Sequence, residues 1–242
     1  MQTTTKIKKA VSHFDEGEVF TYGQLSLSPT EYRAAVKALG RMVQSGLIKR
    51  ASTGRYYKPK KSVFGELKPG EEQLLKPYLF KNGKRIAYIT GEALYNRMGL
   101  TTQVPKNIKI ASRDKRVITK VGSVRVKPVK SYVDVTDRNY FILEILDAIK
   151  DFKEIPDLDT KSALKRLKQK IKELKEDDIE KLVSASLKYP PRVRALTGAL
   201  LTSLNFNTSL VLPLIGSLNP LSTYNFGIKE EELPTVKKWN IS

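Results

Sequence analysis

The sequence contains no cysteine and a single histidine, His13, and these absences remove several classes of chemistry. Without cysteine there is no disulfide framework, no thiolate zinc site, no iron–sulfur cluster and no cysteine nucleophile. One histidine leaves little basis for a Ser-His-Asp triad or a histidine-rich metal centre. A catalytic or metal-binding role would therefore have to rest on carboxylates.

Long hydrophobic runs are also missing. The most apolar stretch, residues 193–218, is interrupted by Asn205, Asn207 and Pro213, which is too much polarity for a transmembrane helix. The first residues include lysines but not the apolar segment of a secretory signal. Because 40% hydrophobic and 8% aromatic residues are typical of globular proteins, we expect a cytoplasmic globular protein without a membrane partner.

Acidic residues are scarce in the first part of the chain. The whole chain has 44 Lys+Arg against 25 Asp+Glu, a net charge of +19. Residues 1–70 carry 13 basic and 5 acidic residues, a balance of +8, and residues 71–138 carry 15 and 6, a balance of +9. Residues 139–242 are nearly balanced, at +2, with 16 and 14. This asymmetry predicts a polyanion-binding N-terminal portion.

Three short helices are expected in the first 45 residues. Thr5 can cap the first, Phe20–Leu25 forms the second, and Ser28 followed by Pro29 opens the third. The third helix ends near Ser45, and its helical spacing predicts that four apolar residues face the core: Tyr32, Val36, Leu39 and Val43.

A basic β-hairpin follows, with strands over residues 47–50 and 55–58 around the turn Ser52-Thr53-Gly54. Three helices and a hairpin are the layout of a winged helix-turn-helix, here over residues 1–60. The third helix would then contact bases and phosphates in the major groove, through Thr30, Arg33, Lys37 and Arg41. The hairpin would bind phosphates through Lys49, Arg50, Arg55 and Lys58. Winged helices also act as protein-interaction modules, which remains an alternative.

Residues 58–70, with two prolines and two glycines, indicate a linker, and residues 71–242 a second, mixed α/β domain. Its strand-rich part, 71–138, has an expected hairpin turn at Gly122-Ser123 and a second basic surface formed by Arg113, Lys115, Arg116, Lys120, Arg125, Lys127 and Lys130. Its helical part is 139–242, with an irregular final stretch. The fold class is therefore α+β.

No Walker A, GxGxxG, HExxH or GxSxG motif occurs in the chain. Asp157 and Asp159 form an Asp-x-Asp pair that could hold a metal, but both precede an expected helix and are better placed to cap it. We expect that the protein is not an enzyme and that it binds neither a cofactor nor a metal ion. A metal-dependent nucleic-acid enzyme that uses this pair is the remaining catalytic alternative.

Several segments, in their order, resemble the AbiEi-type antitoxins of abortive-infection, type IV toxin–antitoxin systems. They are GEVFTYGQL, MVQSGLIKR, STGRYYKPK, TGEALYNRMGLTTQVPKNIKIAS, YPPRVRALTGALLTSL and LNPLSTYNFGI. The resemblance implies a winged helix joined to an antitoxin domain. It also implies repression of the protein's own promoter through double-stranded DNA, and neutralisation of a nucleotidyltransferase-like toxin without a stable complex. A general winged-helix regulator, or a module that neutralises its partner by direct contact, are the alternatives.

Overall fold

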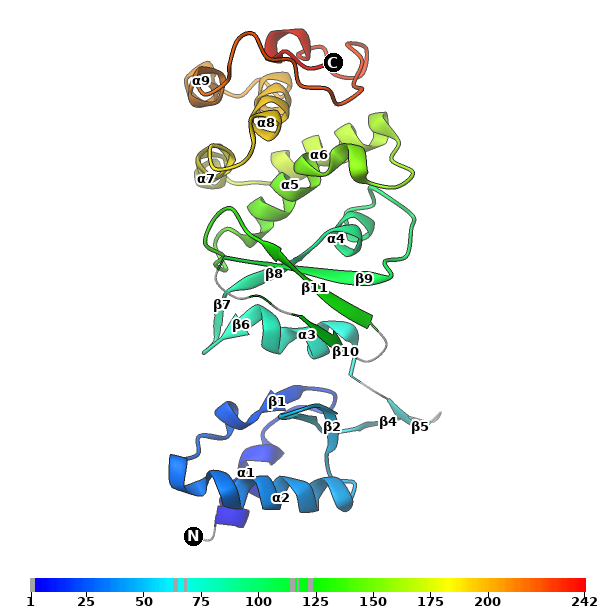
Figure 1. Ribbon diagram of the computed structural model, residues 1–242, viewed down its shortest axis with the longest axis vertical. Helices are drawn as coiled ribbons and strands as arrows, with labels where there is room; N and C mark the ends of the chain where they lie inside the picture. Colours follow the sequence, from blue (N-terminus) through cyan, green and yellow to red (C-terminus); the bar gives the residue numbers. More distant parts are fainter. Residues whose placement is uncertain (1–2, 63–64, 68, 114–115, 117, 122–123) are drawn as a thin grey trace. The chain divides into compact units, whose positions relative to one another are not determined.

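The computed structural model describes residues 3–62, 65–67, 69–113, 116, 118–121 and 124–242, and it is a mixed α+β protein (Figure 1). The chain forms two compact units. The first comprises Met1–Asn82 with Lys120–Ser123, and the second comprises Gly83–Thr119 with Val124–Ser242.

The first unit is built around a three-stranded antiparallel sheet of order β1-β3-β2. Its elements are, in chain order, α1 (Thr3–Ser12), β1 (Val19–Thr21), the 3-10 helices η1 (Tyr22–Leu25) and η2 (Pro29–Glu31), α2 (Tyr32–Gln44), β2 (Lys49–Ser52), β3 (Arg55–Tyr57), β4 (Lys60–Ser62), β5 (Gly65–Leu67), α3 (Glu71–Leu79) and β6 (Phe80–Lys81). The expected second helix is thus a strand followed by one 3-10 turn. Gly54, at a φ of +72°, makes the tight turn between β2 and β3.

The core of this unit corrects the predicted orientation of α2. Ala35, Ala38, Leu39 and Met42 are buried, whereas Tyr32 is 50% exposed and Val36 is 46% exposed. The prediction gave weight to the larger Tyr and Val side chains. In the structure the small alanines face inward, where they let α2 pack closely on α1, whose Ile7 and Val11 are buried in the same cluster.

The opposite face of the sheet is covered by α3. Strand residues alternate between faces, so that Phe20 lies in the core with α1 and α2, while its neighbour Val19 is buried outside that cluster. α3 contacts β1, and the Arg55 guanidinium lies 4.1 Å from the centre of the Tyr78 ring of α3. The unit boundary at Asn82–Gly83 therefore lies beyond the predicted linker at residues 58–70, because α3 packs on the first sheet.

The second unit begins with a sheet in which β11, β9 and β8 are neighbours in that order. Its first elements are β7 (Lys84–Arg85), β8 (Ala87–Thr90), α4 (Glu92–Arg97), β9 (Asn107–Ser112), β10 (Thr119–Val121) and β11 (Val124–Lys130). β9 pairs with β11 in parallel and with β8 antiparallel. The expected turn at Gly122-Ser123 lies outside the described residues.

Helices complete this unit: α5 (Tyr140–Lys150), η3 (Phe152–Glu154), α6 (Thr160–Lys172), α7 (Glu176–Ser186), α8 (Pro191–Ser203), α9 (Thr208–Gly216) and η4 (Lys237–Trp239). α9 corrects the expectation of an irregular final stretch. The Asn207 side chain caps it by accepting from the Ser209 N–H at 3.0 Å, and Val211 and Leu214 bury its apolar side despite Pro213.

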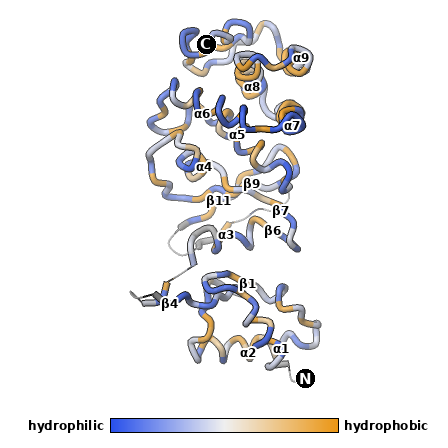
Figure 2. Tube along the Cα trace, turned by 180° about the vertical axis from the view of Figure 1, so that it is seen from behind, coloured by the Kyte–Doolittle hydropathy of each residue, from blue (hydrophilic) through white to orange (hydrophobic). Residues whose placement is uncertain are grey.

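α8 carries the centre of this core, and α8 and α9 are drawn largely in the hydrophobic colour in Figure 2. Trp239 is 1% exposed and packs directly against Gly198, and its indole N–H donates to the Thr202 hydroxyl at 3.1 Å. The end of the chain is thereby fixed on α8. Among the described residues, no helix is long and apolar enough to cross a membrane.

Candidate nucleic-acid interface

The start of α2 is held by a capping arrangement that also reaches α1. Glu31 Oε2 accepts from the Ser28 backbone N–H at 2.9 Å, from the Ser28 hydroxyl at 3.0 Å and from Lys6 Nζ at 3.0 Å. The Ser28 backbone N–H, followed by Lys6, favours the carboxylate and lowers the pKa of Glu31 to about 2. Thr30 is exposed beside this cap, with its hydroxyl 3.0 Å from that of Ser28.

One face of α2 points away from the core. It consists of Arg33, Val36, Lys37, Gly40 and Gln44, which follow the helical spacing i, i+3, i+4, i+7 and i+11 and are all exposed; we name it the α2 face. Within the described part of the chain, Arg33 and Lys37 form no hydrogen bond and no ion pair through their side chains. Two available positive charges therefore stand on an exposed helix face.

Gly40 is the unexpected member of the α2 face. Glycine in a helix interior is less favourable than alanine by about 0.5–1 kcal/mol. Here the backbone needs no glycine, because Gly40 has ordinary helical geometry, and a Cβ built on it would meet nothing within 4 Å. The described residues thus give no internal reason for a glycine at this position.

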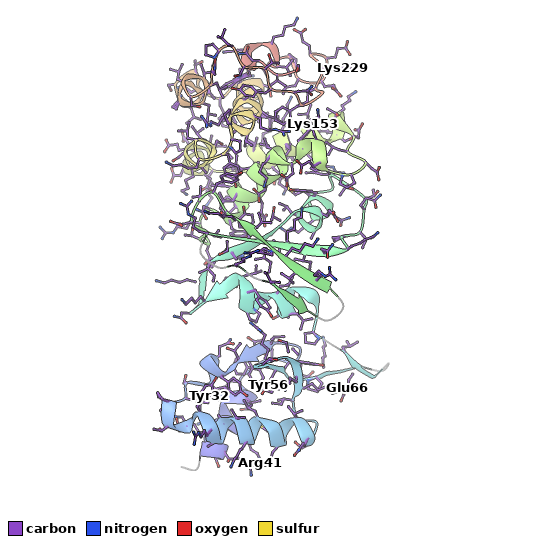
Figure 3. The ribbon with its side chains drawn as sticks, viewed as in Figure 1. Tyr32, Arg41, Tyr56, Glu66, Lys153 and Lys229 are labelled. Atoms are coloured by element: carbon purple, nitrogen blue, oxygen red, sulfur yellow. The ribbon has the colours of Figure 1, made fainter. Side chains whose placement is uncertain are left out.

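Tyr32 and Arg41 lie at the two edges of the α2 face and project to opposite sides of the helix (Figure 3). The Tyr32 ring is 5.1 Å from that of Tyr22, whose hydroxyl lies 2.7 Å from the Tyr56 hydroxyl on β3. Burial, followed by the hydrogen bond with Tyr56, raises the pKa of Tyr22 to about 12. Arg41 donates to the Thr4 hydroxyl at 3.3 Å, which draws it toward α1.

Of the four hairpin residues that are predicted to bind phosphates, one has a side chain that no distant residue in the described part of the chain holds. Lys49 forms an ion pair with Glu66 of β5, so its charge is already compensated. Among the described residues, the exposed Arg50 donates to the Ser52 carbonyl of its own hairpin, at 3.3 Å. Arg50 is therefore the hairpin residue that best fits a phosphate contact.

Arg55 and Lys58 are turned inward. Arg55 lies over the Tyr78 ring and donates weakly to the Ser52 hydroxyl at 3.4 Å. Lys58 Nζ donates to the Phe14 carbonyl at 2.7 Å and to the Ser12 carbonyl at 3.3 Å, at the end of α1. The prediction that both bind phosphates neglected these partners, and we leave both residues out of the proposed interface.

All the described side chains of the second predicted basic surface are exposed. Arg125 and Lys127 are exposed on one side of β11, and Lys130 is exposed on the other. Arg116 and Arg113 are also exposed, and Arg113 donates to the Tyr132 carbonyl and lies 3.9 Å from the Asp134 carboxylate. Lys115 and the Lys120 side chain lie outside the described residues.

The Asp-x-Asp pair serves the fold. Asp159 Oδ1 accepts from the Ser162 N–H at 2.8 Å as the N-cap of α6, which confirms the capping prediction for this residue. Asp157 instead accepts from the Gln103 side chain at 2.6 Å. Among the described residues, no group of three or more His, Asp or Glu side chains could hold a metal ion.

A buried carboxylate in the second unit was missed by sequence reasoning. Asp147, on α5, is 2% exposed and accepts from Thr90 at 2.7 Å, Tyr88 at 2.9 Å, Tyr189 at 3.2 Å and Lys150 at 3.2 Å. Burial, followed by the charge of Asp147, raises the pKa of Tyr88 and Tyr189. The available signal was an aspartate at a core-facing position of an otherwise apolar helix. This polar cluster joins β8, α5 and the segment before α8.

The chain matches the protein family DUF6088, described as a family of unknown function, over residues 6–184. It belongs to that family. The DUF6088 match includes the whole α2 face and extends to α7. A comparison with curated protein sequences gave no match. Among solved structures, the chain resembles the RV2827C protein from Mycobacterium tuberculosis, with 12% identity and a TM-score of 0.53 over 91% of this chain and 83% of the other. At this identity the similarity concerns the fold alone.

Proposed function

We propose that this protein is a non-enzymatic DNA-binding antitoxin that represses its own promoter, and that its first unit is a winged helix-turn-helix. The α2 face carries this proposal, because Arg33 and Lys37, which have no side-chain partner among the described residues, are exposed on a helix that is followed directly by a hairpin that exposes Arg50. The sheet order β1-β3-β2 behind three helical segments agrees with a winged-helix arrangement.

The dimensions of α2 suit the major groove of DNA. Its 13 residues extend over about 20 Å at a rise of about 1.5 Å per residue. Arg33 has the geometry to bond a guanine bidentately, and Lys37 can bond a base or a phosphate. The exposed apolar side chains of Tyr32 and Val36 can contact thymine methyl groups. Thr30 and Arg50 would bind phosphates on either side of these base contacts.

The antitoxin part of the proposal is supported by the resemblance of the quoted segments to AbiEi-type antitoxins. The partner would be a nucleotidyltransferase-like toxin from a neighbouring gene, countered without a stable complex. A cytoplasmic location, which access to the promoter requires, belongs to the same proposal.

DNA binding is tested by a gel-shift titration of the full chain on its own promoter. We expect the variant with Arg33→Ala and Lys37→Ala to lose specific binding. The matched control is Lys76→Ala with Lys81→Ala, which removes the same charge from exposed positions away from the α2 face. Equal binding by both variants, or no binding by the wild type at low salt, would refute the proposal.

Antitoxin activity is tested by co-expression with the product of the adjacent gene. Growth that is restored by the full chain, without co-purification after nuclease treatment, is the expected result. Restored growth with stable co-purification would favour direct neutralisation by a protein-interaction module. Promoter binding without restored growth would favour the alternative that the protein is a general winged-helix regulator.

A further inference from the structure

α6 carries a line of lysines that the proposed function does not use. Lys161, Lys165, Lys168 and Lys172 follow the spacing i, i+4, i+7 and i+11, which places them on one side of the helix; we name them the α6 lysine line. A flanking side of the helix is buried through Ala163, Leu164, Leu167 and Ile171. α6 is drawn largely in the hydrophilic colour in Figure 2.

Several lysines of the same unit pair with acidic side chains, whereas the α6 lysine line has no acidic partner among the described residues. Lys170 pairs with Glu173 at 3.1 Å, Lys181 with Asp178 at 2.6 Å and Lys237 with Glu230 at 2.6 Å. In the described part of the chain, none of the four lysines of the line forms an ion pair or a side-chain hydrogen bond. Their charges are therefore available to an external anion.

The line borders a hollow of about 550 Å³, which is also lined by Leu204 and Glu232. Glu232 is the acidic residue of this lining, and its Oε2 accepts from the Lys229 backbone N–H at 2.9 Å. Burial, followed by the neighbouring charge of Lys172, lowers the pKa of Lys168. In the free protein, like charges are thus close together beside a partly buried ammonium group. A bound anion would reduce the electrostatic repulsion between them.

We propose that the α6 lysine line is a second, sequence-independent binding site, which takes the phosphate backbone of a nucleic acid. The four lysines span about 16 Å of helix at a rise of about 1.5 Å per residue. One strand of a duplex presents about five phosphates over that length, at about 3.4 Å per phosphate along the axis. The length and the charge of the line therefore match a short run of backbone.

An acidic protein surface fits the site less well. Protein–protein interfaces are depleted in lysine and use aromatic and arginine anchors. Of the residues that line the hollow, none is aromatic and none is arginine, and the apolar ones are Leu164 and Leu204. Lysine binds phosphate as a flexible point charge without requiring a base sequence. The composition of the site thus favours a phosphate backbone.

The test removes Lys161, Lys165 and Lys172, the exposed members of the line, by substitution with glutamine. The matched control is the triple Lys→Gln variant at Lys170, Lys181 and Lys237, which loses the same charge from paired positions. Both triples are made in the full chain that also carries Arg33→Ala and Lys37→Ala. The α2 face then contributes little, and failure of the proposed promoter binding does not affect the result.

Binding is measured by fluorescence anisotropy against salt concentration, with three probes of unrelated sequence: duplex DNA, single-stranded DNA and an RNA hairpin. For the tightest probe we expect the α6 triple to weaken binding at least about ten-fold and to flatten the salt slope by about 2.7 for duplexes or about 2 for a single strand. The control triple should keep the slope of its parent. The probe bound most tightly identifies the kind of nucleic acid.

Two outcomes would overturn the site. One is an α6 triple whose affinity and salt slope equal those of the control triple for all three probes. The other is poly-glutamate binding as tightly as a nucleic acid of equal charge, with the same dependence on the α6 lysines, which would indicate an acidic protein partner.

Discussion

Replacing Gly40 with alanine should stabilise the protein and weaken its binding to DNA. The position is exposed in the interior of α2, has ordinary helical geometry, and has open space where a Cβ would be. The added methyl group therefore meets no neighbour in the free protein. On the α2 face it would stand between the helix backbone and a bound groove, beside Val36 and Lys37.

The size of both effects can be estimated. The helix interior favours alanine over glycine by about 0.5–1 kcal/mol, so the free energy of unfolding should rise by that amount. In a unit of about 80 residues, 1 kcal/mol corresponds to about 4–8 °C in Tm. DNA binding should weaken about ten-fold, or about 1.4 kcal/mol, which is at the low end of the loss of one base contact.

Stability is followed by hydrogen exchange of the α2 amides, because the single tryptophan lies in the second unit. Binding is followed by titration on the promoter. Ala34→Gly, at an exposed position on another side of α2, is the control and should destabilise the helix without a matching loss of affinity. A Gly40→Ala variant that is more stable and binds DNA as well as the wild type would refute a close approach of the α2 backbone to DNA at Gly40. A Gly40→Ala variant that is less stable than the wild type would refute the expectation that the added methyl group meets no neighbour in the free protein.

Three further substitutions test contacts that lie within one unit or the other. Glu31→Gln should lower Tm at pH 7, and the difference should disappear as the pH falls from about 4.5 toward about 2, because the lowered pKa of Glu31 stabilises the fold only while the carboxylate is charged. Asp147→Asn should lower the free energy of unfolding in urea by about 3 kcal/mol, since it removes the buried carboxylate that pairs with Lys150 and leaves this lysine the Asp151 carboxylate at 3.5 Å. Gly198→Ala should cost about 1–3 kcal/mol and shift the Trp239 emission to the red, because the methyl group would overlap the indole ring.

Each has a control at an exposed or open position: Glu180→Gln for the first, Asp157→Asn for the second and Gly216→Ala for the third. A constant Tm difference for Glu31→Gln across this pH range would contradict its cap. An Asp147→Asn variant within about 0.5 kcal/mol of the wild type would mean that the cluster tolerates a neutral amide. Native Trp239 emission after Gly198→Ala would show that the chain end can move without cost.

Local pattern was sufficient for the third helix, which ends at Gln44, and for the hairpin that follows it with its turn at Gly54. It failed for the orientation of this helix, α2, where the predicted core face included Tyr32 and Val36. A periodic pattern weighs large apolar side chains most strongly, whereas close packing of two helices selects small ones. The error thus fell on the face that we propose to contact DNA, where exposed apolar groups have an external use.

The charges show the same division. Composition and chain order, which are properties of the sequence, determined that most of the positive excess lies before residue 139 and that a basic hairpin follows a basic helix. Only the tertiary structure decided which charges are available, because an ion pair or a cap depends on residues distant in sequence. Lys58 donates to a backbone carbonyl at the end of α1, 44 residues earlier, and Lys49 forms an ion pair with Glu66. Arg33, Lys37, Arg50 and the α6 lysine line keep their charges available because the described residues place no such partner beside them.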